Sequence, residues 1–259
     1  MKLLCLNLWG GRQGRILDDF LVESAKDTDI FCFQEVFNST AEVFDYEKAR
    51  PHLFEDLQKL LPEFNGYFAP AYEGWIDRQR VDFSVLSGQA IFMKKSINIE
   101  QNGFVYVYGD ERTNISDDFI NEPRVLQYAD LNIGDKKLLI ANAHGKWHPG
   151  EKLDTPERLV QSQKILDLLA QFKQPKILCG DFNLMPNTKS IQMFAENLED
   201  LIAKFGIKST RNKISWTNYG NVQHFADFTF VSKNIKIKSF EVPYMEVSDH
   251  LPMVMEFET

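Results

Sequence analysis

Two short motifs in the second half of the chain carry side chains suited to phosphate chemistry. The first is the run Gly180-Asp181-Phe182-Asn183, which follows an apolar segment. Asp181 and Asn183 point the same way if the local chain is extended, and Gly180 would let the backbone approach a ligand closely. The alternative is an Asx-type turn leading into a helix, because Asp and Asn both favour turns.

The second motif, Ser248-Asp249-His250, precedes the last apolar segment. A hydrolase that depends on Mg²⁺ needs a hard oxygen ligand beside a group that contacts phosphate, and an adjacent Asp and His supply both. A simple local turn is the alternative. Asp227 lies within another apolar run, so it needs a buried partner, for which a histidine is suitable.

Three further polar residues stand where strand-length apolar segments end: Asn7, Glu35 and His144. Strands of one sheet bring their ends together at one rim, where sheet-based enzymes hold their catalytic groups. Taken singly, Asn7 suits a turn or cap, Glu35 a solvated loop, and His144 a hydrogen-bonded structural histidine. Their shared position at strand ends favours convergence on one site.

The elements expected to position these residues are short strands and a few helices. Helical spacing appears at 16–25, at 156–172 behind an N-cap at Thr155, at 44–61 with a break near Pro51, and at 191–201. The strand-length runs lie at 2–6, 29–33, 90–93, 125–131, 137–142, 176–179, 225–231, 235–240 and 253–257.

Nothing in the sequence marks a domain boundary. Long linkers, repeats and low-complexity tracts are absent, so we expect one domain over residues 1–259. The long irregular stretch at 72–87 carries Trp75, Arg78 and Arg80, which suits a functional surface loop better than a linker.

Composition limits the setting and the partners. The chain is 44% hydrophobic with a formal charge of −8, so its surface as a whole repels phosphate and any anionic substrate must be met locally. No run approaches the roughly 20 apolar residues of a membrane span, and no signal-peptide pattern is seen. Cys5, Cys32 and Cys179 lie in apolar runs and are expected as buried thiols. We expect a cytoplasmic monomer that does not contact a membrane.

In their order along the chain, these motifs resemble the endonuclease/exonuclease/phosphatase superfamily, the DNase-like metal-dependent phosphohydrolases. The resemblance runs from Asn7 to His250, and the motifs Gly180–Asn183 and Ser248–His250 are its most specific parts. It implies an α/β fold, a four-layer sandwich of two packed mixed β-sheets flanked by helices, with the active site at one rim. It also implies an enzyme that hydrolyses phosphate esters.

The resemblance implies a metal shell formed by Asn7, Glu35 and Asp249. Hard carboxylate and carbonyl oxygens with retained waters suit Mg²⁺, with Mn²⁺ as the alternative ion. Asp181 matches the carboxylate that activates the attacking water for in-line displacement, and Asn183 its neighbour that positions water and phosphate. A second ion between Asp181, Asn183 and Asp249 is compatible with the motifs, so the number of ions stays open.

The same resemblance places two histidines at the phosphate. His250 would contact a phosphoryl oxygen, oriented by Asp227, and His144 would lie at the phosphate or the leaving group. Arg124, just before a central strand, would hold an active-site carboxylate or the phosphate. Phosphate esters resist attack through their own negative charge, so the chemistry needs groups that neutralise developing charge.

Loops that combine aromatic and cationic residues are the candidates for substrate binding, namely those with Trp75, Arg78 and Trp147. Hydrophobic lids with solvated arginines are the alternative. The first hypothesis for the function is a phosphodiesterase or nuclease, with nucleic acid among the candidate substrates, although the acidic charge disfavours a non-specific nuclease.

Two other functions compete with this first hypothesis. One is a phosphomonoesterase acting on a small sugar- or inositol-type phosphate. The other is a non-catalytic module that binds a phosphate ligand. The module is disfavoured because the charged residues are all retained, and an unneeded carboxylate cluster repels itself.

Overall fold

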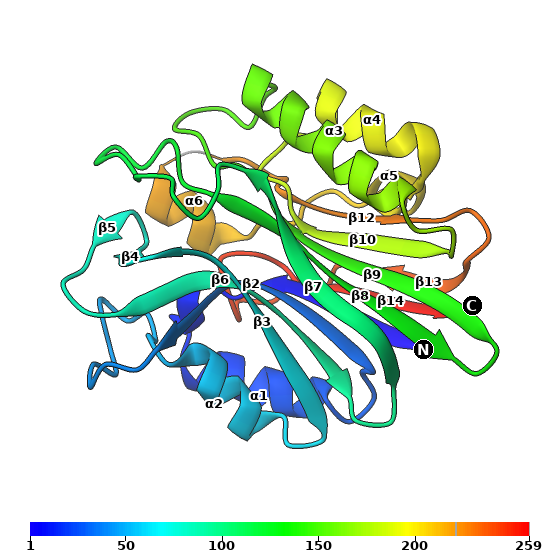
Figure 1. Ribbon diagram of the computed structural model, residues 1–259, viewed down its shortest axis with the longest axis horizontal. Helices are drawn as coiled ribbons and strands as arrows, with labels where there is room; N and C mark the ends of the chain where they lie inside the picture. The colour runs from blue at the N-terminus through cyan, green and yellow to red at the C-terminus, as the bar shows by residue number, and fades with distance from the viewer. Residues whose placement is uncertain (221, 259) are drawn as a thin grey trace.

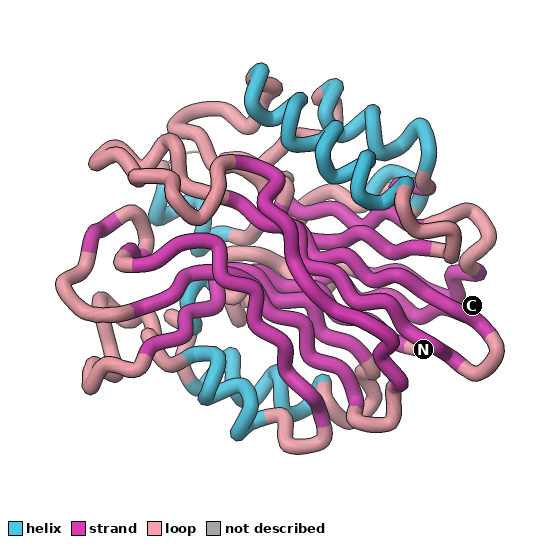
Figure 2. Tube along the Cα trace, in the orientation of Figure 1, coloured by secondary structure: helices cyan, strands magenta, loops and turns pink. Residues whose placement is uncertain are grey.

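Two six-stranded β-sheets pack face to face between layers of helices in the computed structural model, which describes residues 1–220 and 222–258 (Figure 1). Figure 2 shows the strands gathered in the middle, with helices above and below them. The four-layer α/β sandwich expected from the sequence is therefore confirmed.

The first sheet is formed by β1 (Lys2–Asn7), β2 (Ile30–Ser39), β3 (Phe64–Glu73), β6 (Val85–Lys94), β13 (Lys236–Glu241) and β14 (Met253–Glu258). The second sheet is formed by β7 (Asn98–Tyr108), β8 (Arg124–Ile133), β9 (Lys136–His144), β10 (Lys176–Asp181), β11 (Glu199–Asp200) and β12 (Asp227–Val231). Two short strands, β4 (Trp75–Ile76) and β5 (Gln79–Arg80), pair as a separate hairpin.

Both sheets are mixed. Their strand orders are β13-β14-β1-β2-β6-β3 and β11-β12-β10-β9-β8-β7. The pairs β1–β2 and β9–β10 are parallel, and the other pairs recorded within the two sheets are antiparallel. Each sheet therefore holds one parallel pair in its interior, and the paired segments end at Asn7 and Gln34 in the first sheet and at His144 and Asp181 in the second.

Helices cover the outer faces of the sheets (Figure 1). α1 (Arg15–Ser24) and α2 (Leu53–Leu60) lie against the first sheet, whereas α3 (Pro156–Ala170), α4 (Lys189–Asn197) and α5 (Leu201–Lys204) lie against the second. A 3₁₀ turn at Trp9–Gly11 follows β1, and α6 (Lys213–Tyr219) lies near one rim. Within the described residues, no helix is both long and apolar enough to span a bilayer.

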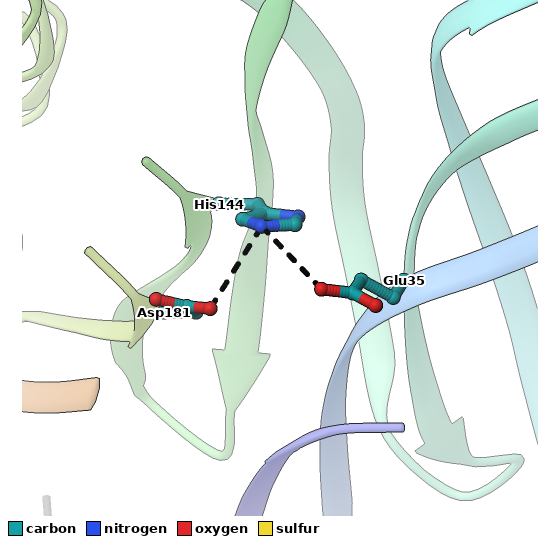
Figure 3. A group of neighbouring side chains, drawn as sticks. All are labelled: Glu35, His144 and Asp181. Carbon is teal, nitrogen blue, oxygen red and sulfur yellow. Dashed lines mark ion pairs between the residues drawn. The ribbon is translucent and has the colours of Figure 1, made fainter. Parts of the chain in front are cut away.

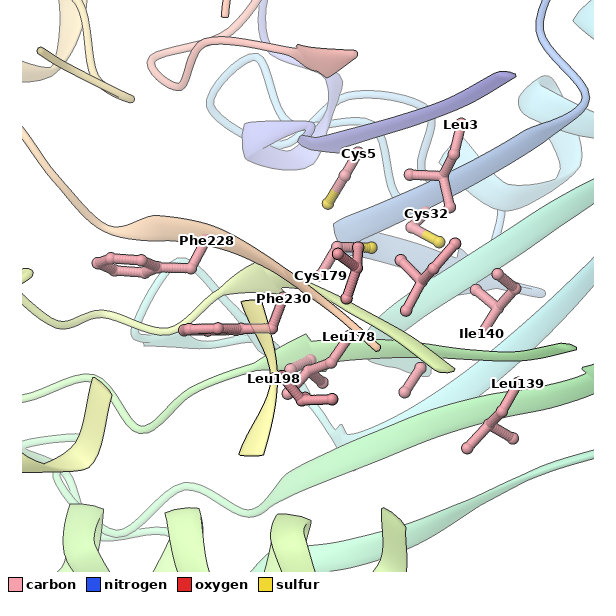
Figure 4. Packing of buried hydrophobic residues seen from close by; sticks show 14 of the residues in the cluster. Leu3, Cys5, Cys32, Leu139, Ile140, Leu178, Cys179, Leu198, Phe228 and Phe230 are labelled. Carbon is pink, nitrogen blue, oxygen red and sulfur yellow. The ribbon is translucent and has the colours of Figure 1, made fainter. Parts of the chain in front are cut away.

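Central strands such as β1 and β10 are apolar on both faces because both faces are covered. In β1, Leu3 and Cys5 belong to the core between the sheets, while Leu4 and Leu6 pack with the α1 and α2 side. Figure 4 shows part of the core between the sheets, including Cys5, Cys32 and Cys179. The three cysteines are buried and free, as expected.

Several elements differ from the sequence predictions. The expected helix at 44–61 begins only at Leu53, because Pro51 disfavours the helical conformation of the residue before it. The strands β3 and β7 were not predicted, since each lies at a sheet edge with an exposed face and an interrupted apolar pattern. The stretch at 72–87 is less irregular than expected, as it contains β4, β5 and the adjoining ends of β3 and β6.

Candidate active site

The register of the second sheet gathers three candidate residues at one rim. Asp181, at the end of β10, is paired with His144 on β9 and with Asp227 on β12. Across the sandwich, Asn7 ends β1 beside Gln34 of β2. The candidate residues therefore meet because the parallel pairs of the two sheets end at the same rim. Of these residues, Asp181 and His144 line a cavity of about 400 Å³.

A bulge in β2 turns Glu35 into this cavity. The β2–β6 register shifts between Gln34 and Val36, which leaves Glu35 without a partner strand residue. Its backbone has a φ of 51°, in the left-handed region that non-glycine residues rarely adopt. Bulges of this kind re-aim side chains and often occur beside active sites.

Asn7 joins the carboxylates of Glu35 and Asp181. Its Nδ2 donates to Glu35 Oε1 at 2.9 Å and to Asp181 Oδ2 at 3.1 Å. Its Oδ1 accepts from the backbone N–H of Trp9 at 2.9 Å. Asn7 thus lies against both carboxylates of the site, and its predicted role as a metal ligand stays a prediction.

Glu35, Asp181 and His144 form a group that fits a divalent cation. His144 Nε2 lies 4.0 Å from Glu35 Oε1 and 3.8 Å from Asp181 Oδ2 (Figure 3). Burial, followed by the charge of Asp249, raises the pKa of Glu35. A carboxylate that is desolvated beside another anion is stabilised by a cation, and hard oxygens suit Mg²⁺ or Mn²⁺. Glu35 and Asp181 would hold the ion.

A second group consists of Asp181, Asp227 and His250. His250 Nδ1 lies 2.8 Å and 2.9 Å from the two oxygens of Asp227, and its Nε2 lies 3.6 Å from Asp181 Oδ2. Burial lowers the pKa of His250, but the surrounding carboxylates outweigh it and the pKa is raised. Burial raises the pKa of Asp181, but the cationic groups around it prevail and the carboxyl stays ionised. The predicted Asp227–His250 pair is thus present, with His250 Nε2 beside Asp181.

His144 is held by a buried arginine. Arg124 donates from Nη1 to His144 Nδ1 at 3.2 Å, and from Nε and Nη2 to Glu122 Oε1 at 3.1 Å and 2.7 Å. Because Arg124 is always a donor, His144 Nδ1 must accept, which assigns the ring proton to Nε2 on the cavity side. Burial and Arg124 hold the pKa of His144 well below its usual range, so the ring is a neutral N–H donor.

In the Gly180–Asn183 motif, the structure gives a reason for the glycine that the sequence did not indicate. A Cβ at Gly180 would lie 1.9 Å from the backbone oxygen of Ala143, and the φ of Gly180 is 143°. The glycine is thus required by the close approach of β9, not by a ligand. Asn183 has a φ of 54° and donates from Nδ2 to the Gly145 oxygen at 3.3 Å, which ties the motif to the loop after β9.

Two cations that sequence reasoning missed lie in the cavity. Lys152 is buried and donates from Nζ to Asn183 Oδ1 at 3.0 Å, and burial lowers its pKa to about 8. Arg211 is also buried and forms an ion pair with Asp249 at 2.8 Å. Neither residue stands at a strand end or in a recognisable motif. Their positive charge within polar loop segments was therefore the only sequence signal that they could belong to the site. Asp249 contacts Arg211 through Oδ2, and its predicted role as a metal ligand stays a prediction.

The aromatic and cationic loop residues divide between two cavities. The Arg78 guanidinium lies 4.8 Å from the centre of the Trp147 ring, and both residues line the cavity of Asp181. Trp75 lines a neighbouring cavity and packs behind Phe119, with ring centres 5.3 Å apart. Trp75 was predicted to bind substrate, but it is not among the described residues that line the cavity of Asp181; it packs against Phe119, which does line that cavity.

Solved structures of similar fold cover essentially the whole chain. A mannosyl-6-phosphatase from Bacteroides thetaiotaomicron shares 20% identity with a TM-score of 0.70, covering 100% of both chains. An endonuclease/exonuclease/phosphatase family protein from Leptotrichia buccalis shares 19% identity with a TM-score of 0.74, also over 100% of both chains. The human Nocturnin catalytic domain with bound sulfate shares 22% identity with a TM-score of 0.67, covering 100% of this chain and 93% of that one.

Sequence comparisons are more restricted. A search of curated proteins finds no significant match. The model of the Endonuclease/Exonuclease/phosphatase family, in contrast, matches residues 4–250, which include every member of the two acidic and histidine groups. The chain therefore belongs to the endonuclease/exonuclease/phosphatase family and is a phosphoester hydrolase.

Proposed function

We propose that this protein is a divalent-metal-dependent hydrolase of small or terminal phosphate esters. The observation that carries the proposal is one cavity that is lined by Glu35, Asp181 and His250 and also by Arg78 and Trp147, which contact each other. The cavity contains acidic groups that would hold a cation and histidines that would contact phosphate. It leaves limited space for the rest of the substrate.

The ion expected at Glu35 and Asp181, Mg²⁺ or Mn²⁺, would supply positive charge to the phosphoryl group when bound. Asp181 remains ionised and so accepts a hydrogen bond from the attacking water, which orients it for in-line displacement. Because Asp181 has a low affinity for a proton, its main contribution is to orient the attacking water and not to remove a proton from it.

The remaining polar groups bind the phosphate. Neutral His144 donates from Nε2, and His250, oriented by Asp227, donates from Nε2 when protonated. The Lys152 ammonium beside Asn183 adds a charge-assisted donor. Donors fixed in a buried cavity stabilise developing negative charge more strongly than the same groups in water.

The shape of the cavity favours small substrates. Arg78 in the β4–β5 turn and Trp147 in the loop after β9 both line the cavity and contact each other. Cleavage inside a polymer requires the chain to pass on both sides of the scissile phosphate, and this contact obstructs one side. A volume of about 400 Å³ is typical of small-molecule sites. The geometry thus favours the phosphomonoesterase alternative over a nuclease that cuts internally.

The test is a substrate panel with Mg²⁺ that pairs small and polymeric esters. It includes aryl phosphate mono- and diesters, mannose 6-phosphate, inositol phosphates, a mononucleotide, a phosphocholine lipid, RNA, and single- and double-stranded DNA. Hydrolysis of a small or terminal ester should be fastest, and the Asp181→Asn variant should lose about 10²-fold or more of it. Faster internal cleavage of long DNA or RNA would reject the size argument, and an unchanged Asp181→Asn rate would reject the role of Asp181.

A further inference from the structure

Arg211 is placed at the cavity by the backbone of the C-terminal motif. It lies just before α6 and forms an isolated antiparallel bridge with His250. The neighbouring Thr210 accepts from the backbone N–H of Leu251 at 2.8 Å. The Arg211 side chain is only 7% exposed, yet it lines the cavity together with Asp181 and Asp249.

The guanidinium of Arg211 is held in one orientation. Its Nη2 donates to Asp249 Oδ2 at 2.8 Å, and its Nη1 lies 2.7 Å from His250 Nε2. Ser215 Oγ accepts from both Nε and Nη2, at 3.0 Å and 2.6 Å. A planar group bound on three sides is positioned before any substrate arrives.

These contacts make Asp249 unlike Glu35. Asp249 is 2% exposed and its charge is compensated by a buried arginine. Glu35, by contrast, is contacted by the Asn7 amide and faces His144, and the described part of the chain records no lysine or arginine ion pair for it. The acidic residues of the cavity are therefore divided between a side open to a cation and a side that already contains one.

We propose that Arg211 is a catalytic residue that binds the phosphoryl group on the Asp249 side, so that the enzyme uses one divalent ion, at Glu35 and Asp181. The inference rests on the proposed phosphoester hydrolysis. In it, the positive charge of Arg211 takes the place of the charge that a second metal ion would supply. Arginine keeps its charge when buried and presents its donors in a fixed plane, so Nη1, held at the cavity, is the donor available to a phosphoryl oxygen.

The contact with His250 indicates where the anion binds. Nη1 of Arg211 is always a donor, so it bonds His250 Nε2 only while that nitrogen has no proton. A phosphoryl oxygen at this edge of the guanidinium would accept from Nη1 of Arg211 in place of His250 Nε2. The substrate would thereby exchange an internal hydrogen bond of Arg211 for one to an anion.

The test measures metal binding and phosphate binding separately. Mn²⁺ binding is titrated calorimetrically in the wild type and in the Glu35→Gln and Asp249→Asn variants. The wild type should bind one Mn²⁺, Glu35→Gln should weaken it at least tenfold, and Asp249→Asn should change it by less than about threefold. Two Mn²⁺ per chain, or equal losses in both variants, would overturn the proposal.

Inorganic phosphate is then titrated into the metal-free protein. Arg211→Gln should weaken phosphate binding about 10- to 100-fold and Arg211→Lys less, with Mn²⁺ binding unchanged in both. Lys213→Gln is the matched control, because it removes the same charge from a side chain that is 65% exposed on α6. Circular dichroism checks folding, and Arg211→Lys keeps the buried charge if Arg211→Gln unfolds.

The outcomes separate the inference from the proposed function. Unchanged phosphate affinity in folded Arg211→Gln or Arg211→Lys would reject the role of Arg211, even if the protein hydrolyses phosphate esters. If no ester is hydrolysed but the binding pattern holds, the proposed hydrolysis fails and the assignment of Arg211 as an anion-binding residue stands.

Discussion

Lys152 Nζ lies 3.0 Å from Asn183 Oδ1, so a buried ammonium from the loop after β9 stands beside the motif that follows β10. The contact is buried and lies in the same cavity as Asp181. The loop itself is anchored, since Lys152 O accepts from the backbone N–H of Met185 at 2.8 Å. This relationship brings a lysine that is distant in the sequence into the cavity of Asp181.

Replacing Lys152 should therefore impair the reaction. The Lys152→Met variant keeps most of the side-chain volume but removes the charge-assisted donor, so kcat/KM on the best small ester should fall about 10- to 100-fold. Lys189→Met, which alters an exposed lysine at the start of α4, should leave kcat/KM within twofold. Equal rates for Lys152→Met and the wild type would show that the ammonium does not contact the phosphate.

The charge of Lys152 should also give a pH dependence. Burial lowers the pKa of Lys152 to about 8, so the ammonium is present below that pH and is lost above it. Phosphate affinity of the metal-free protein should decline as the pH rises from 7 to 9.5. In Lys152→Met the decline over the same interval should be smaller, and parallel curves for the two proteins would contradict the assignment.

Asp154 should stabilise the loop that carries Lys152. It accepts from the backbone N–H groups of Lys189 and Ser190 at 2.7 Å and 3.0 Å, at the start of α4. The side chain of the N-cap residue Thr188 does not cap this helix and donates to the Met185 oxygen instead. Asp154→Ala should lower the free energy of unfolding by about 1 kcal/mol at pH 7, measured by urea denaturation. Glu151→Ala, in the same loop and exposed, is the control.

The stabilisation by Asp154 should disappear in acid. Burial raises the pKa of Asp154, but the hydrogen bonds from Ser190 and Lys189 prevail and the pKa is lowered. A carboxyl whose folded pKa is lowered stabilises the protein above its unfolded value of about 4, and the effect is lost as the pH falls through the folded pKa. The difference between wild type and Asp154→Ala should thus be full at pH 6 and shrink below pH 4. A constant difference would mean that ionisation is irrelevant.

Removal of the divalent ion should abolish hydrolysis. Activity should disappear with a chelator and return on addition of Mg²⁺ or Mn²⁺, because the carboxylates alone cannot neutralise a phosphate ester. The melting temperature should rise with Mn²⁺ concentration, since an ion that binds the folded state stabilises it. Glu35→Gln should lose this rise, and Glu63→Gln, at an exposed site, should retain it. Full turnover in the chelator would refute the metal site.

The contact between Arg78 and Trp147 should restrict substrate size. Arg78→Gln removes the cation that lies over the ring, so the rate on an oligonucleotide should rise at least threefold relative to the rate on an aryl phosphate. Arg80→Gln changes the same hairpin, but on the side of the neighbouring cavity, and should leave the ratio unchanged. A ratio that moves equally in both variants would reject the contact as the barrier.

The sequence by itself determined the local elements and the motifs. Short apolar runs of strand length predicted nine of the strand segments, and the N-cap Thr155 with Pro156 predicted the start of α3, because these signals act over a few neighbouring residues. Polar residues at strand ends, together with the family resemblance, also identified Glu35, Asp181 and His250.

Tertiary structure decided which of these groups meet and what they contact. The β2 bulge at Glu35, the amide bridge of Asn7, the Arg211–Asp249 pair and the inward turn of Lys152 depend on contacts between segments far apart in the chain. Burial and neighbouring charge set the pKa of each group only after folding. A lysine or arginine in a loop looks the same in a sequence whether it lies in solvent or against a phosphate site.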